Sequence, residues 1–181
     1  NGSIVANSED QAKTSISEIY NVVKRNDVLS SSFNANKSQI ESKATNSIVM
    51  YQTSNGKTKD GLRDGFDVFD EIHMYQDDSG VSVYESGLGK VPESRQFEIG
   101  SDGYVRDGYL DEKKDIALQV MGGQLPPDTM FPFWCKLDSE EEVDDETMWE
   151  KANPMLSNPL TGYGKTLFRK IRKQYLKMQS Q

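Results

Sequence analysis

Two adjacent carboxylates, Asp70 and Glu71, are the side chains with the clearest potential for chemistry. They directly follow a short apolar-rich run, residues 66–69. Hydrolysis of a phosphate anhydride needs one carboxylate to hold hydrated Mg²⁺ and a second to polarise the attacking water. A strand ending at this point would place both at the carboxyl edge of a sheet, where open α/β sheets bind their ligands. The residues alone leave open that these are two solvated acids at a strand end.

The motif that should accompany such acids is missing. No G-x-x-x-x-G-K-[ST] phosphate loop occurs in the 181 residues. The letters DEIH at positions 70–73 also match the DExH box of helicases, which use the same chemistry. The acid pair therefore predicts a catalytic function only if other segments support it.

Composition limits the classes of protein to which the chain can belong. The sequence has one cysteine, Cys135, and one histidine, His73, which excludes an intramolecular disulfide and a Cys/His zinc site. No apolar run approaches the ~20 residues of a membrane span, and no charged leader with an apolar run is visible at the start. The net charge is −8, yet residues 165–181 hold six basic side chains and no acid. This asymmetry predicts an acidic body with a basic helix at the end.

Hydrophobic periodicity predicts alternating strands and helices. We expect strands at residues 3–6, 47–53, 66–69, 95–99 and 131–137. We expect a helix that is capped by Ser8 and has its apolar face at residues 12–23, and further helices at 80–89, 111–121, 145–152 and 165–178. We also expect a loop with one weak strand at 26–46 and a solvated acidic loop at 138–146. Cys135 should then be buried on a strand. The pattern predicts an α/β fold with a mostly parallel sheet covered by helices on both faces.

Four sequence segments in order resemble one family, the large terminase subunit of tailed phages, which joins a packaging ATPase to a nuclease. They are residues 6–12 (ANSEDQA), 60–73 (DGLRDGFDVFDEIH), 102–112 (DGYVRDGYLDE) and 149–156 (WEKANPML). They resemble the strand and Gln-Ala helix after the phosphate loop, the Walker B segment, the segment after it, and the Trp-x-Lys-Ala-Asn-Pro signature. The resemblance extends over roughly residues 5–178.

The resemblance implies roles for individual residues. Asp70 corresponds to the Walker B acid that holds Mg²⁺, and Glu71 to the catalytic glutamate. Residues 100–103 occupy the coupling motif, which links ATP hydrolysis to movement. There Ser101 keeps one hydroxyl, as a nucleotide-contacting residue would, but Gly100 stands where the family has a second hydroxyl. Arg63 is a candidate arginine finger for a neighbouring subunit, with an exposed loop arginine as the alternative. His73 is a candidate γ-phosphate sensor or an ordinary packed histidine.

The resemblance also implies that the chain is an internal fragment. Residues 1–160 would be the C-terminal portion of a RecA-like, additional-strand ATPase domain that lacks its first strand and phosphate loop. Residues 161–181 would be a basic amphipathic helix leading toward the absent nuclease. We expect the sheet to be truncated, with strand 3–6 or 66–69 exposing an edge. Alone, the fragment should hold no ATP tightly and hydrolyse almost none.

For the intact protein, the resemblance implies Mg²⁺ and ATP as cofactors and double-stranded DNA, the portal and a small terminase subunit as partners. It would work as a ring of identical subunits in the cytoplasm of the bacterial host, without a membrane. Two alternatives stay open. A DExH helicase fragment predicts arginine-rich motifs, which residues 80–160 lack. A non-enzymatic interaction domain predicts a complete sheet.

Overall fold

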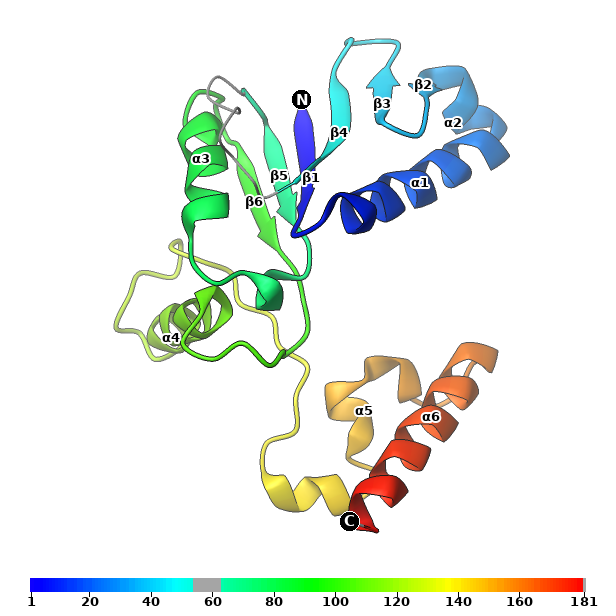
Figure 1. Ribbon diagram of the computed structural model, residues 1–181, viewed down its shortest axis with the longest axis vertical. Helices are drawn as coiled ribbons and strands as arrows, with labels where there is room; N and C mark the ends of the chain where they lie inside the picture. Colours follow the sequence, from blue (N-terminus) through cyan, green and yellow to red (C-terminus); the bar gives the residue numbers. More distant parts are fainter. Residues whose placement is uncertain (54–62, 181) are drawn as a thin grey trace. The chain divides into compact units, whose positions relative to one another are not determined.

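The structure is a computed structural model that describes residues 1–53 and 63–180 (Figure 1). It consists of two compact units, Asn1–Gln119 and Val120–Gln181. The first contains the sheet, and the second contains the basic helix. None of the helices in the described ranges combines the length and apolarity needed to cross a membrane.

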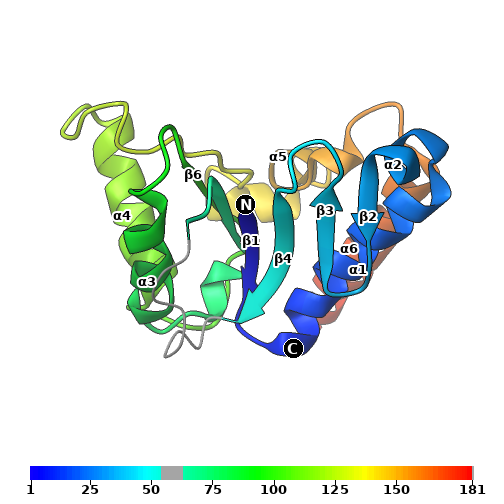
Figure 2. The same ribbon diagram turned by 90° about the horizontal axis from the view of Figure 1, so that it is seen from above.

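Unit 1 is built on one six-stranded sheet with the order β2-β3-β4-β1-β5-β6, which Figure 2 shows from above. The strands are β1 (Gly2–Ala6), β2 (Phe33–Ala35), β3 (Gln39–Ser42), β4 (Ile48–Thr53), β5 (Phe66–Phe69) and β6 (Arg95–Glu98). The pairs β4-β1, β1-β5 and β5-β6 are parallel, whereas β2 and β3 extend the sheet in antiparallel fashion. The predicted α/β fold with a mostly parallel sheet is confirmed.

Helices follow the strands of unit 1 in the expected alternation. They are α1 (Glu9–Arg25), α2 (Asp27–Ser32), the 3₁₀ turn η1 (Ile72–Met74), α3 (Ser79–Leu88) and α4 (Tyr109–Met121). Ser8 caps α1 as its sequence pattern predicts: the hydroxyl accepts the backbone N–H of Gln11 at 3.3 Å. Two acids in the first turn and two basic residues in the last complement the helix dipole.

Each face of the sheet has its own apolar core, because successive strand residues point to opposite faces. On one face Val5 and Phe69 pack with Val81 and Tyr84 of α3. On the other face Ile4 packs with Ile16 of α1 and with partners from β3 and β4. Both faces of β1 are therefore buried, which explains the continuous apolar run at residues 4–6.

The expected position of an open sheet edge is wrong. Strand β1 pairs with β4 on one side and β5 on the other, and β5 also pairs with β6. Within the described chain, the edge strands are β2 and β6. The error arose because sequence order does not give spatial order: β4 follows β1 in sequence and β5 follows β4, but β1 lies between them.

The prediction of a loop with one weak strand at residues 26–46 is also wrong. This segment forms α2, β2 and β3. The Asn26 carboxamide oxygen accepts the backbone N–H of Leu29 at 3.0 Å and so starts α2. Leu29, Phe33 and Ile40 then pack into the core on the α1 face. These apolar residues are too widely spaced to show a period, so the polar composition concealed them.

Unit 2 is helical. It contains the 3₁₀ turns η2 (Glu140–Asp144) and η3 (Pro154–Leu156), with helices α5 (Trp149–Ala152) and α6 (Gly162–Gln179). The predicted strand at 131–137 is absent: these residues have no regular structure, Phe131 is 90% exposed and Cys135 is exposed. Pro132 lacks the N–H that a sheet ladder requires, which explains the failure. Likewise, a turn of 3₁₀ helix lies within the predicted acidic loop.

The predicted last helix is confirmed, with a start three residues earlier. The Thr161 hydroxyl caps α6 by accepting the backbone N–H of Gly164 at 3.0 Å. A functional division of the chain at residue 160 stays a prediction.

Candidate active site

Asp70 lies where the two central parallel strands end. It is the first residue after β5, and its backbone N–H donates to the carbonyl oxygen of Val5, near the end of β1, at 2.8 Å. One carboxylate oxygen, Oδ2, accepts the Ser15 hydroxyl of α1 at 3.2 Å. The side chain is therefore held at the carboxyl edge of the sheet, against the first turns of α1.

Glu71 turns the chain sharply away from the strand. Its φ and ψ angles are 55° and 47°, in the left-handed region that a residue with a side chain rarely adopts. The 3₁₀ turn η1 begins at the next residue. Its carboxylate is 42% exposed, and Oε2 lies 3.1 Å from Nδ1 of His73. At this distance the two side chains form an ion pair only when the imidazole is protonated. The geometry between the two atoms does not meet that of a hydrogen bond, and Nδ1 of His73 has no hydrogen-bond partner among the described residues.

The segment 100–103 lies directly against the turn that follows Glu71. The backbone N–H of Ile72 donates to the carbonyl oxygen of Ile99 at 3.1 Å. A Cβ atom placed on Gly103 would lie 2.5 Å from Cδ2 of His73, and one on Gly100 would lie 3.4 Å from its Nδ1. The absence of side chains at these two glycines allows the imidazole to pack onto the 100–103 backbone.

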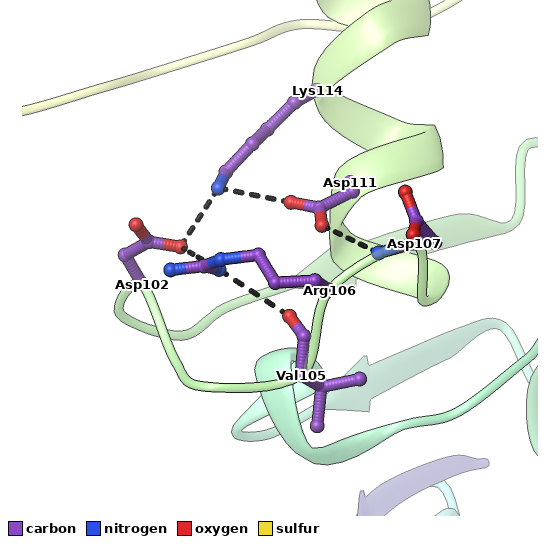
Figure 3. Close-up of polar contacts among 6 residues, drawn as sticks. All are labelled: Asp102, Val105, Arg106, Asp107, Asp111 and Lys114. Atoms are coloured by element: carbon purple, nitrogen blue, oxygen red, sulfur yellow. Dashed lines mark hydrogen bonds and ion pairs between the residues drawn. The ribbon is translucent and has the colours of Figure 1, made fainter.

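A polar network ties the same segment to α4 (Figure 3). Lys114 Nζ lies 2.8 Å from Asp102 Oδ1 and 3.3 Å from Asp111 Oδ1, and the Arg106 guanidinium approaches Asp102 at 3.5 Å. The Asp111 carboxylate also accepts the backbone N–H of Asp107 at 3.0 Å. Chiefly because Lys114 donates a hydrogen bond to it, the pKa of Asp102 lies below its ordinary value. The network therefore favours the ionised carboxylate.

The structure brings some of the predicted site residues together and separates another. Asp70, Glu71 and the exposed Ser101 follow the carboxyl ends of the adjacent parallel strands β5 and β6. Arg63 precedes β5 and is exposed, so it lies at the opposite end of that strand. An arginine there does not join the acid pair of its own subunit. The Asp60-Gly61-Leu62 part of the second segment falls outside the described residues.

Sequence analysis missed two features around these strands. Ser15 lies off the apolar stripe of α1, and a strand-to-helix unit gives no signal for which hydroxyl reaches the strand end. Asp67 was taken as part of an apolar run, although it is 1% exposed on β5 beside the buried Asp64. Ser3 donates to Asp64 Oδ2 at 2.6 Å, while Asp67 Oδ1 has no partner among the described residues.

Burial and the neighbouring Asp64 carboxyl raise the pKa of Asp67 to about 7. Both acids are more than 95% buried, since Asp64 is 4% exposed and Asp67 is 1% exposed. A protonated carboxylic acid among buried groups avoids the cost of an unpaired charge. We assign this pair to the core rather than to the candidate site.

The donor atoms at the strand end fit the expected Mg²⁺. Magnesium ions take oxygen ligands and are usually held by one or two carboxylates together with waters and substrate phosphates. Asp70 uses only Oδ2 in its hydrogen bond with Ser15, and neither Asp70 nor Glu71 pairs with a lysine or arginine in the described ranges. Those ranges hold no cluster of three or more acidic, His or Cys ligands. Asp70 and Glu71 match the one or two carboxylates that a protein usually supplies to Mg²⁺.

Several known proteins are similar to this chain. The profile of the family described as "Terminase large subunit, ATPase domain" matches residues 1–118. The terminase large subunits of Lactococcus phages p2 and SK1 are each 24% identical over 160 residues, covering 86% of this chain and 29% of theirs. Protein YmfN of Escherichia coli (strain K12) is 26% identical over 87 residues, covering 48% of this chain and 19% of its own.

The crystal structure of the HK97 bacteriophage large terminase has a similar fold. It superposes with a TM-score of 0.73 at 18% identity, covering 96% of this chain and 36% of that one. The chain thus spans about a third of the length of the solved terminase, and less of the curated relatives. Since the family profile matches well over half of its residues, the chain belongs to the family of terminase large subunit ATPase domains.

Proposed function

We propose that this chain is the part of a phage DNA-packaging ATPase that carries the catalytic acids. In the intact large subunit, Asp70 would hold hydrated Mg²⁺ and Glu71 would orient the water that attacks the γ-phosphate of ATP. The observation that carries the proposal is the placement of both carboxylates at the carboxyl edge of parallel strands, where α/β folds bind their ligands.

Each residue has a defined part in this reaction. Asp70 is held by Ser15 on one carboxylate oxygen, which leaves the other available to a metal-bound water. When bound, Mg²⁺ would neutralise charge on the β- and γ-phosphate oxygens. Glu71 is partly exposed, so its carboxylate can accept a proton from water during in-line attack. Ser101 follows the adjacent strand β6 and is exposed, so its hydroxyl would contact nucleotide at the same edge of the sheet.

The open side of β6 suits the missing phosphate loop. In the described chain, β6 pairs only with β5, and Phe97 is 51% exposed. Val68 and Phe97 are in register on parallel strands, so both point to the α1 face. On that face an apolar groove of about 440 Å³ is lined in part by Val22, Phe66 and Val68.

A strand added beyond β6 would bring a helix onto this groove. A parallel strand that connects to β1 through a helix does so with right-handed crossover in nearly all folds. The connection from β1 to β4 crosses the α1 face of the sheet. A connection from a strand beyond β6 to β1 crosses the sheet in the same direction, so a right-handed crossover also places its helix on the α1 face. We propose that the strand and helix of the phosphate loop occupy these positions in the intact subunit.

The partners and location follow from the same proposal. The intact subunit would act as a ring on the portal, with double-stranded DNA and a small terminase subunit as partners, in the cytoplasm of the bacterial host. Arg63, exposed at the far end of β5, would act on ATP bound by a neighbouring subunit if it is an arginine finger. Residues 161–181 would lead toward the nuclease.

The test is Mg²⁺-ATP turnover by the intact large subunit carrying Glu71→Gln. Removal of a general base lowers turnover by about 10²–10⁴-fold, whereas Glu18→Gln, the same change at an exposed position on α1, should leave it unaltered. Turnover that survives Glu71→Gln would place the base elsewhere. An intact subunit that never hydrolyses ATP would favour an interaction domain.

A further inference from the structure

Helix α6 has one side that packs against its own unit. The rings of Phe168 and Tyr175 lie 5.8 and 5.5 Å from the Trp149 ring, centroid to centroid. Trp149 is 4% exposed, and its indole N–H donates to the carbonyl oxygen of Val143 at 2.8 Å. This side of α6 is fixed against the segment that holds the acidic run.

Most acids of that run have partners. Asp144 accepts the Tyr175 hydroxyl at 2.8 Å and the Gln179 side chain at 3.2 Å, while Arg172 pairs with Glu146 at 2.7 Å. Glu142 and Asp138 pair with Lys151. Asp144 and Glu146 therefore bond to α6 itself, while Lys151 of α5 neutralises Asp138 and Glu142.

The opposite side of α6 is a stripe of cations. We define the basic stripe as Lys165, Arg169, Lys170, Lys173 and Lys177. Four of them recur at intervals of four residues, which advances about 40° around the helix and about 6 Å along it per step. All five are exposed, and in the described ranges none pairs with an acid. Arg169 bonds only to the Lys165 carbonyl and the Thr166 hydroxyl of its own helix.

The basic stripe and the packed side lie on different sides of α6. On the helical wheel, Phe168 and Tyr175 lie roughly opposite the centre of the basic stripe. Asp144, which bonds to Tyr175 and Gln179, therefore lies away from the stripe, whereas Glu146 is neutralised by Arg172, which borders the stripe. A polyanion that approaches the stripe meets local positive charge, although the whole chain carries −8.

We propose that the basic stripe of α6 binds the phosphate backbone of double-stranded DNA without sequence preference. The choice of duplex DNA rests on the proposed packaging function, and the charge segregation is independent of it. A row of lysine and arginine side chains provides phosphate contacts, which position a protein on DNA without specifying a base. Sequence-independent contact suits a protein that must hold any segment of a genome.

The experiment measures binding of the full 181-residue chain to a fluorescent mixed-sequence duplex by anisotropy, at a series of salt concentrations and without nucleotide. With three to five phosphates neutralised, log Kobs should fall with log salt at a slope of about −3 to −4.5. The variant Lys165→Gln/Arg169→Gln/Lys173→Gln should bind at least about tenfold more weakly and lose about 2.7 units of that slope. Circular dichroism should show that its helix is retained.

The matched control is Lys24→Gln/Lys37→Gln/Lys90→Gln, which removes as many exposed cations from unit 1. It should bind duplex nearly as well as the unaltered chain. Absence of duplex binding at low salt, or equal loss in the control, would overturn the proposal. Binding to phosphatidylserine vesicles but not to duplex would overturn it in favour of a membrane surface. Because no ATP is present, the outcome is independent of the Glu71→Gln test.

Discussion

The imidazole of His73 lies between the Glu71 carboxylate and the backbone of Gly103. Its Nδ1 is 3.1 Å from Glu71 Oε2, and its Cδ2 would be 2.5 Å from a Cβ on Gly103. The candidate catalytic glutamate and the candidate coupling segment therefore contact the same ring. A change on either side must be accommodated by the histidine, whose side chain is only 16% exposed.

Replacing Gly103 with alanine should displace this ring. The added methyl group cannot fit without moving His73, and overpacking of this kind costs about 1–3 kcal/mol of unfolding free energy. His73 is the only histidine, so each of its two carbon-bound ring protons gives a single NMR resonance, which should shift. Gly89→Ala is the control, since a Cβ there meets nothing within 4 Å. An unchanged His73 resonance in Gly103→Ala would contradict the packing described here.

Replacing Lys114 with glutamine should loosen the 100–103 segment from α4. The lysine holds Asp102 at 2.8 Å, but the pair is partly exposed, so stability should fall by less than about 1 kcal/mol. In the intact subunit we expect DNA packaged per ATP hydrolysed to fall while ATP turnover itself changes little. Lys114→Arg, which keeps the charge, should restore most of the yield. An unaltered yield with glutamine would show that Asp102 and Lys114 do not transmit movement.

The sequence was informative where patterns are local and continuous. The apolar run of β1, the cap at Ser8 and the strand before Asp70 all follow from neighbouring residues, and the structure confirms these elements. Predictions from the sequence were wrong where the result depends on the spatial order of the strands. Nothing local shows that β1 lies between β4 and β5, so the edges were misplaced.

The contacts of the candidate site depend on the same long-range order. Ser15 meets Asp70 across 55 residues of sequence, and Lys114 meets Asp102 from the next helix. Such pairs have no spacing rule, because the loops between them vary in length. Family resemblance pointed to Asp70, Glu71 and residues 100–103, whose roles stay predictions, but the hydroxyl and the lysine that hold them became visible only in the fold.

Stability should depend on pH through Asp67. Its folded pKa of about 7 is higher than the ordinary value of 3.8, so the folded state binds a proton more tightly than the unfolded state. This contribution is fully present below about pH 4 and is lost as pH rises through 7. Asp67→Asn should therefore raise the free energy of unfolding at pH 8 by up to roughly 4 kcal/mol and flatten the dependence of stability on pH. Asp128→Asn, at an exposed position, should leave the profile unchanged. A fall in stability at pH 8 in Asp67→Asn would contradict the assignment.

Truncating Trp149 should release α6 from unit 2. The indole is 4% exposed, contacts Phe168 and Tyr175, and donates to Val143, so Trp149→Ala removes both a buried aromatic and a hydrogen bond. Such changes cost about 3–5 kcal/mol. Amide hydrogen exchange across residues 162–179 should accelerate sharply, because most of the stability of a protein helix comes from the packing of its apolar face. Trp134→Ala is the matched control: that indole is 37% exposed in a segment without regular structure, so α6 protection should persist. If α6 kept its protection in both variants, the helix would be stable without its aromatic contacts. The Trp149 contacts would then not be what fixes the packed side of α6 and orients the basic stripe.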